Sequence, residues 1–311
     1  MTALAIPKFI PLALDDRSIR PLRMAVITDL HHGLAPDAAM RLRHFVHAVR
    51  RFPNIDLAVQ MGDFCHPTKD AVDYVNLFND LPCRKLHVLG NHDMDYCDKV
   101  TAMRFLGMST RYGVYDVGDF RFIVLDLNHL KHGDRVIPYA YGNYFTTPQT
   151  SYIDQEQLDW LDRQLRVSTR PVILISHQPL GFAEPGKPLP PEQLEVLQVI
   201  SAASKANPDG KVAACIFGHR HVDRLEYYEG IPCLCINSAS YFWDKGMYPY
   251  TKPLYAFIKI TPQGHMYVSG VEGGFAKAPP ATCSRIPGLS ASVTCRRLAL
   301  RAKCATGLRS A

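Results

Sequence analysis

From residue 23 onward, short apolar runs alternate with longer stretches whose apolar residues recur at helical spacing. The stretch 36–52 shows helical spacing clearly, with Leu42, Phe45, Val46 and Val49 at positions i, i+3, i+4 and i+7 of one face. The apolar runs predict strands at 24–28, 57–61, 85–89, 172–176 and 212–217. Helices are expected over 36–52, near 70–79, from 154 onward and over 192–203. Two strand–helix units in succession favour a parallel sheet with right-handed crossovers at the start of the chain.

The middle of the chain departs from this alternation. Residues 112–117 and 120–126 flank Gly118-Asp119 and predict a β-hairpin, whereas the aromatic-rich stretch 127–152 predicts a long loop. Asp154 predicts a helix N-cap with Gln157 at the third helical position. Further short strands are expected at 223–228, 233–236, 254–260 and 266–270. Together these elements predict an α/β fold in which two mixed β-sheets pack on each other with helices outside.

The positive charge of the chain is concentrated at its C-terminal end. The formal net charge is +6 over 311 residues, and seven basic residues with no acidic ones follow Gly274. The rest of the chain is therefore close to neutral, so the basic isoelectric point does not indicate a nucleic acid polymer as partner. We expect residues 1–22 to form an N-terminal extension and 23–273 the domain. Residues 274–311 then form a basic tail, peripheral or disordered.

Membrane and redox features point to one location. No apolar run approaches the ~20 residues of a membrane-spanning helix, and no basic stretch typical of a signal peptide precedes the first apolar residues. The nine cysteines are odd in number and form no C-x-x-C motif. We interpret them as buried free thiols in a reducing compartment, which favours a cytoplasmic location.

Five of the predicted strands each end in a group of metal-binding residue types. The groups read DLHH (29–32), GD (62–63), GNHD (90–93), SHQP (176–179) and GHRH (218–221). Each alone is common in turns and caps, but the carboxyl ends of parallel strands meet at one edge of a sheet, so the five together predict one site. Mixed carboxylate and imidazole ligands suit Mn, Fe, Zn or Co. Enough ligands are present for two ions: Asp29, His31, Asp63, Asn91, His177, His219 and His221.

These groups make the sequence resemble the calcineurin-like metallophosphoesterase superfamily, whose pattern is D-x-H, G-D, G-N-H-[DE], H and G-H-x-H. The match extends from about residue 24 to 270 and fills every ligand position in order. The resemblance implies a four-layer αββα sandwich with a dinuclear metal site at one edge. It assigns Asp29, His31 and His221 to one ion, Asn91, His177 and His219 to the other, and Asp63 to both. The nucleophile of such a site is expected to be a metal-bound hydroxide that attacks phosphorus in line.

The resemblance also gives His92 a catalytic role. His92 follows the ligand Asn91 directly, so we expect it to face the substrate phosphate without binding metal. It can then stabilise the phosphoryl charge or protonate the leaving oxygen, with Asp93 orienting and charging its imidazole. Four further residues are candidates for substrate binding: His32, His66, Tyr144 and Tyr241.

The sequence leaves the substrate open among small phosphate esters. The helix containing Gln157-Leu158-Asp159-Trp160-Leu161 and the single-domain layout look like the branch that contains the class III cyclic nucleotide phosphodiesterases. The aromatic stretches 139–145 and 241–250 either line the cleft and stack on a base or pack against the sandwich. A phosphodiesterase acting on nucleotides or similar small diesters is the favoured hypothesis. A phosphomonoesterase, including a phosphoprotein phosphatase, is the second hypothesis, and a non-catalytic interaction scaffold of the same fold is the third.

Overall fold

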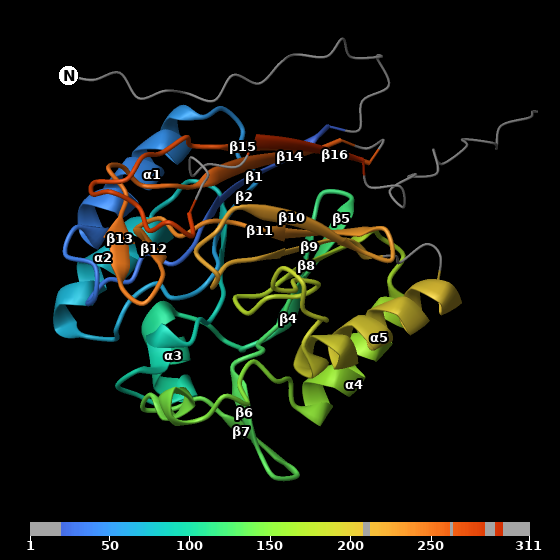
Figure 1. The fold of residues 1–311 in the computed structure, drawn as a ribbon. Coiled ribbons are helices and arrows are strands. Elements are labelled where there is room, and N and C mark those ends of the chain that lie inside the picture. The colour runs from blue at the N-terminus through green and yellow to red at the C-terminus, as the bar shows by residue number, and fades with distance from the viewer. Residues whose placement is uncertain (1–19, 208–211, 262–263, 284–289, 295–311) are drawn as a thin grey trace, which may run out of the picture.

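The computed structural model describes residues 20–207, 212–261, 264–283 and 290–294, whose strands form two six-stranded sheets and two small two-stranded ones (Figure 1). The first sheet has the order β16-β15-β14-β1-β2-β3, and the second has the order β10-β11-β9-β8-β5-β4. The strands of the first sheet are β1 (Leu22–Ile27), β2 (Leu57–Gln60), β3 (Arg84–His87), β14 (Ala256–Ile260), β15 (His265–Gly270) and β16 (Ser290–Thr294). Those of the second are β4 (Gly113–Val117), β5 (Phe120–Val124), β8 (Val172–Ile175), β9 (Val212–Phe217), β10 (Arg224–Tyr228) and β11 (Ile231–Cys235).

Both sheets are mixed, and each contains a run of neighbouring parallel strands, which in the first sheet extends to the edge strand β3. In the first sheet β1 and β3 both pair in parallel with β2, while β14 pairs antiparallel with β1. In the second sheet β8 pairs in parallel with β5 and β9, and β11 pairs in parallel with β9. The strand ends that carry the sequence motifs are therefore the ends of parallel strands, as predicted.

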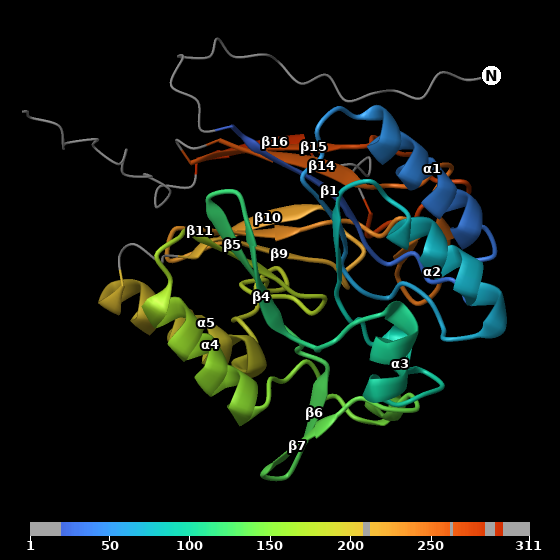
Figure 2. The same cartoon turned by 180° about the vertical axis from the view of Figure 1, so that it is seen from behind.

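The side chains of β1 show how the layers are held together. Met24 and Val26 point into the apolar layer between the two sheets, while Ala25 and Ile27 point to the layer shared with the helices. Three helices cover that face of the first sheet: α1 (Ala38–Arg51), α2 (Val72–Asn79) and α3 (Lys99–Leu106). On the outer face of the second sheet lie α4 (Gln155–Val167) and α5 (Pro191–Ala206) (Figure 2). The predicted four-layer αββα arrangement is confirmed.

The stretch 127–152 contains more structure than the predicted long loop. It holds a hairpin of β6 (His129–His132) and β7 (Arg135–Pro138) and a short 3-10 helix, η3 (Asn143–Thr146). The pattern of apolar residues does not reveal this hairpin, because β7 is largely exposed. Its strands are defined by backbone pairing and not by burial. Sequence reasoning also missed α3 and the hairpin of β12 (Tyr241–Trp243) and β13 (Met247–Pro249). Two further 3-10 turns are η1 (Lys69–Ala71) and η2 (His92–Met94).

The N-cap of α4 forms as predicted, but Gln157 has another partner. The Asp154 side chain accepts a hydrogen bond from the Gln157 backbone N–H at 3.1 Å. The Gln157 side chain accepts from the Asp126 backbone N–H and donates to the Asp126 carbonyl, both at 2.8 Å. This amide therefore ties the start of α4 to the residues that follow β5, instead of closing a capping box.

The first sheet continues beyond the expected last strand. Residues 290–294 form β16, which pairs antiparallel with β15, so placing the final strand at 266–270 was wrong. Phe275 also packs against Tyr250, with ring centroids 5.2 Å apart. The predicted N-terminal extension up to residue 19 and the tail at 284–289 and 295–311 lie outside the described residues. Within the described part, the free cysteines include Cys65, Cys83, Cys97, Cys215, Cys233 and Cys235. None of the described helices is long and apolar enough to span a membrane.

Candidate metal centre

The seven predicted ligands come from the carboxyl ends of five parallel strands, three in one sheet and two in the other. The ends of β1, β2 and β3 supply Asp29, His31, Asp63 and Asn91, and the ends of β8 and β9 supply His177, His219 and His221. Within the described residues, their side chains form groups able to hold a cation: Asp29/His31/His221 and Asp63/His177/His219, each with ligand atoms within 4.8 Å of one another. The structure therefore brings the predicted ligands together at one edge of the sandwich.

The backbone at these strand ends is strained. Five of the seven ligands are non-glycine residues in the left-handed region, with φ between 49° and 65°: Asp29, His31, Asp63, His219 and His221. Such conformations cost free energy and persist where the surrounding structure fixes them, most often at functional sites. The turns that aim these side chains inward are therefore maintained against local preference.

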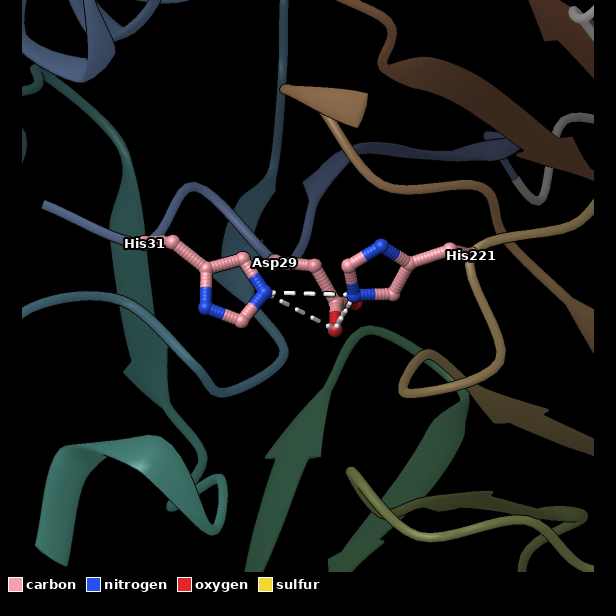
Figure 3. A group of neighbouring side chains, drawn as sticks. All are labelled: Asp29, His31 and His221. Atoms are coloured by element: carbon pink, nitrogen blue, oxygen red, sulfur yellow. Dashed lines mark hydrogen bonds and ion pairs between the residues drawn. The ribbon is translucent and has the colours of Figure 1, made fainter. Parts of the chain in front are cut away.

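The first ligand group, shown in Figure 3, converges on a single point. The Nε2 atom of His221 lies 3.1 Å from Asp29 Oδ1 and 3.1 Å from His31 Nε2. His221 Nδ1 lies 2.8 Å from the Tyr241 carbonyl, so it donates its proton there and leaves the Nε2 lone pair facing Asp29 and His31. Asp29 Oδ1 is buried and accepts no hydrogen bond from the described residues. One carboxylate oxygen and two imidazole nitrogens thus fit a transition-metal ion.

The second ligand group is built in the same way. His177 Nδ1 lies 2.8 Å from the Met61 carbonyl, which leaves Nε2 to face Asp63 Oδ2 and Asn91 Oδ1, each at 3.2 Å. Asp63 Oδ2 also lies 3.8 Å from His31 Nε2 of the first group. Its other oxygen, Oδ1, accepts the backbone N–H of His92 at 2.7 Å. Asp63 is therefore anchored by one oxygen and presents the other between the two groups, as a bridging ligand requires.

Two motif glycines are required by close packing around the carboxylates. A Cβ atom on Gly90 would lie 2.0 Å from the Asp63 backbone nitrogen and 2.2 Å from Asp63 Oδ1. A Cβ atom on Gly218 would lie 2.2 Å from Thr28 Oγ1 and 2.6 Å from Asp29 Oδ2. The glycines therefore permit a close approach between strand ends, a stronger requirement than the turn that the sequence suggested.

Burial and mutual charge set the ionisation of the ligands. Burial lowers the pKa of His31 to about 3, and burial with the neighbouring His177 lowers that of His219 to about 3, so both rings offer free lone pairs. Burial would raise the pKa of Asp29, but His221 and His177 outweigh it and hold the carboxyl ionised. Burial alone would lower the pKa of His177, but the nearby carboxylates of Asp63 and Asp29 outweigh burial and raise it to about 9. Two buried carboxylates among imidazoles fit bound cations.

The expected contact between Asp93 and the imidazole of His92 does not form. Asp93 accepts hydrogen bonds from the backbone N–H groups of Phe64, Cys65 and Gly90 at 2.8–3.0 Å, so it braces the loop behind the ligands. The partner of His92 is Asp95, whose Oδ2 lies 2.9 Å from His92 Nδ1. Sequence reasoning missed Asp95; its signal was an acid three residues after His92, the spacing of one helical turn.

The four candidate substrate residues have different surroundings. His66 Nε2 lies 3.1 Å from Asp95 Oδ2, and the Tyr144 hydroxyl donates to Asp95 Oδ1, so both belong to the surroundings of His92. The Tyr241 ring lies 5.1 Å from that of His31, and its carbonyl orients His221. His32 instead packs on Tyr74, with ring centroids 4.5 Å apart.

A second residue missed by the sequence analysis supports Asn91. The Gln178 side chain donates to Asn91 Oδ1 at 3.0 Å and to Asn128 Oδ1 at 3.1 Å. It therefore fixes the orientation of the Asn91 amide, which presents its oxygen to His177. The only sequence signal was its position beside His177 within SHQP.

Comparison with known proteins agrees with this geometry. The family model for calcineurin-like phosphoesterases matches residues 22–223. A probable cyclic nucleotide phosphodiesterase from Synechococcus sp. is 29% identical over 171 residues, covering 51% of this chain and 58% of that protein. The chain thus aligns with less than two thirds of the relative's length.

Solved structures share the fold at low sequence identity. A dimetal phosphatase from Danio rerio superposes with a TM-score of 0.60 at 17% identity, over 84% of this chain and 100% of that one. GAP50, the anchor in the inner membrane complex of Plasmodium, superposes with a TM-score of 0.54 at 14% identity, over 86% and 89%. The predicted fold is confirmed, and the fold alone occurs in proteins with different roles.

Proposed function

The chain belongs to the calcineurin-like phosphoesterase family, and we propose that it is a two-metal phosphodiesterase that acts on nucleotides or similar small diesters. The observation that carries the proposal is the pair of ligand groups that share Asp63 Oδ2, with His92 beside them. Mn, Fe, Zn or Co ions held by Asp29, His31 and His221, and by Asn91, His177 and His219, with Asp63 between them, would activate water and stabilise phosphoryl charge.

We assign the leaving-group proton to His92. Its ligand atom groups with those of His31 and Asp63, and its side chain keeps 26% exposure, so it faces the metal centre and remains open to a substrate. In the reaction, water loses one proton to solvent and its oxygen bonds to phosphorus as the bond from phosphorus to the leaving oxygen breaks. The leaving oxygen takes a proton from His92, which regains one from solvent.

Asp95 takes over the orienting role first expected of Asp93. With its proton directed at Asp95 Oδ2, His92 Nδ1 is fixed and Nε2 is left for the substrate. Burial would raise the pKa of Asp95, but hydrogen bonds from His66 and His92 lower it to about 2, so the carboxylate stays charged.

Two features support a diester over a monoester. The curated relative is a probable cyclic nucleotide phosphodiesterase. Arg220, which lies between two ligands, has its guanidinium paired with Glu184 at 2.9 Å and stacked over Phe182, so it is engaged away from a second phosphate charge. The buried free thiols of Cys65, Cys97, Cys215, Cys233 and Cys235 also support a cytoplasmic location. We take residues 23–273 as the hydrolase domain, to which β16 adds a further strand of the first sheet.

The first experiment compares two substrates on the full chain reconstituted with each metal. We expect a higher kcat/KM for bis-p-nitrophenyl phosphate than for p-nitrophenyl phosphate. The reverse order would identify a phosphomonoesterase. A protein that holds two ions but hydrolyses neither substrate would be an interaction scaffold.

The second experiment tests the assignment of the proton donor. His92→Asn should lower turnover by about 10²–10⁴-fold on a dialkyl phosphodiester, and less on the nitrophenyl diester, whose leaving group departs without a proton. Asp95→Asn should also lower turnover more on the dialkyl diester than on the nitrophenyl diester, but by a smaller factor than His92→Asn. The control Asp134→Asn changes an exposed acid in the β6–β7 turn and should leave turnover on both substrates unchanged. Equal losses on the two substrates would remove His92 as proton donor.

A further inference from the structure

An aromatic side chain stands exposed beside His92. Phe145, on η3, is 65% exposed, and its ring centroid lies 5.8 Å from that of His92 and 4.4 Å from that of Tyr144. We propose that the Phe145 ring is a stacking surface for the leaving group of the substrate. The preferred substrates are then phosphodiesters whose leaving alcohol carries a planar ring, such as a nucleoside or an aryl group. This inference rests on the proposed phosphodiesterase function.

The segment that carries Phe145 is held in place on the loop that carries His92. The Gly142 backbone N–H donates to the Met94 carbonyl at 3.1 Å, and the Tyr141 backbone N–H donates to the Cys97 carbonyl at 3.0 Å. The Tyr144 hydroxyl donates to Asp95, which also holds His92. Phe145 is thus an exposed apolar ring on an anchored segment. A rigid surface of this kind loses little entropy when a ligand stacks on it.

The side of the centre on which Phe145 lies identifies which part of the substrate it meets. His92 gives its proton to the leaving oxygen, so the leaving group extends from phosphorus toward His92 and the adjacent Phe145. Aromatic rings pack at centroid distances of 4.5–7 Å, and the 5.8 Å between Phe145 and His92 lies within this range. Tyr141 is 68% exposed but forms no ring contact with His92 in the described part of the chain. Exposure alone therefore does not single out Phe145; its place beside the proton donor does.

The test varies the leaving group at nearly constant acidity. Methyl phenyl phosphate and methyl hexafluoroisopropyl phosphate have leaving groups of similar acidity, of which only phenol is planar and aromatic. The kcat/KM ratio of the first to the second is measured for the metal-loaded full chain, Phe145→Ala, Phe145→Tyr and Tyr227→Ala. Tyr227 is a matched control, because it is 58% exposed and lies on β10.

We expect Phe145→Ala to lower the ratio by about 5- to 150-fold, the range that stacking on an aromatic side chain contributes in other sites. The loss should fall on the phenyl ester, Phe145→Tyr should keep the ratio, and Tyr227→Ala should not change it. Equal losses of Phe145→Ala on both esters would overturn the inference and leave Phe145 as a support for Tyr144. An unchanged ratio would overturn it as well.

The experiment distinguishes a failure of the stacking inference from a failure of the phosphodiesterase proposal. If the wild-type chain hydrolyses only monoesters, the phosphodiesterase proposal fails. The stacking inference is then decided by the same ratio on phenyl phosphate and hexafluoroisopropyl phosphate, with the same expected and contradicting results.

Discussion

Replacing Gly90 by alanine tests how two neighbouring strand ends of the first sheet position Asp63. The added methyl group would lie 2.0 Å from the Asp63 backbone nitrogen and 2.2 Å from Asp63 Oδ1, and real Cβ atoms essentially never approach within 3.0 Å. The strand ends must therefore separate by about 1 Å. Asp63 Oδ1 is already fixed by the His92 backbone N–H at 2.7 Å, so the displacement cannot be absorbed by a side-chain rotation alone.

The expected magnitude has two parts. Overpacking of this kind costs about 1–3 kcal/mol, which lowers Tm by roughly 2–10 °C in a protein of this size. Metal ligands must lie within about 0.2 Å of their ideal distances, so moving Asp63 by about 1 Å removes the ligand that both ions share. We therefore expect Gly90→Ala to lose most of its bound metal and its activity while it remains folded.

The assay combines metal analysis by mass spectrometry, calorimetry and turnover of the nitrophenyl diester. Gly246→Ala is the control, because a Cβ atom there meets nothing within 4 Å and its φ lies outside the positive region. A Gly90→Ala protein with two ions per chain and unchanged turnover would refute the reasoning. A loss of metal in the control as well would show that the assay reports a general effect of alanine.

Three other predictions follow from particular residues. Chelation should abolish turnover and lower Tm, with recovery on adding Mn²⁺, and Asp63→Ala should retain neither ion; activity after complete removal of metal would contradict this. Burial lowers the pKa of His87 to about 4, so the unfolded chain binds more protons between pH 4 and 6.5. Unfolding free energy should therefore fall by on the order of 2–3 kcal/mol as pH drops through that window, and His87→Gln should flatten the profile; an equal slope in the variant would assign it to other groups. Truncation after Cys283 removes β16 and should lower Tm by a few degrees with kcat unchanged, whereas a lower kcat would connect this strand to the site.

The sequence alone determined the positions of the strands that lead into the site and the set of candidate ligands. Apolar runs fixed the central strands to within a few residues because these strands are buried on both faces, as the fully buried β8 and β9 show. The ligand types follow those runs directly, so their convergence at the carboxyl ends could be predicted from local pattern and chain topology.

The partners of the side chains were decided by the tertiary structure. The contacting pairs are far apart in the sequence: His31 and His221 by 190 positions, Gly90 and Asp63 by 27, and Tyr144 and Asp95 by 49. His92 pairs with Asp95 and not with the next residue, Asp93. The reason is the 3-10 turn of η2, which directs Asp93 to the backbone of Phe64 and Cys65. Local periodicity specifies which face a residue occupies, but a hydrogen bond depends on distances and angles set by several elements at once.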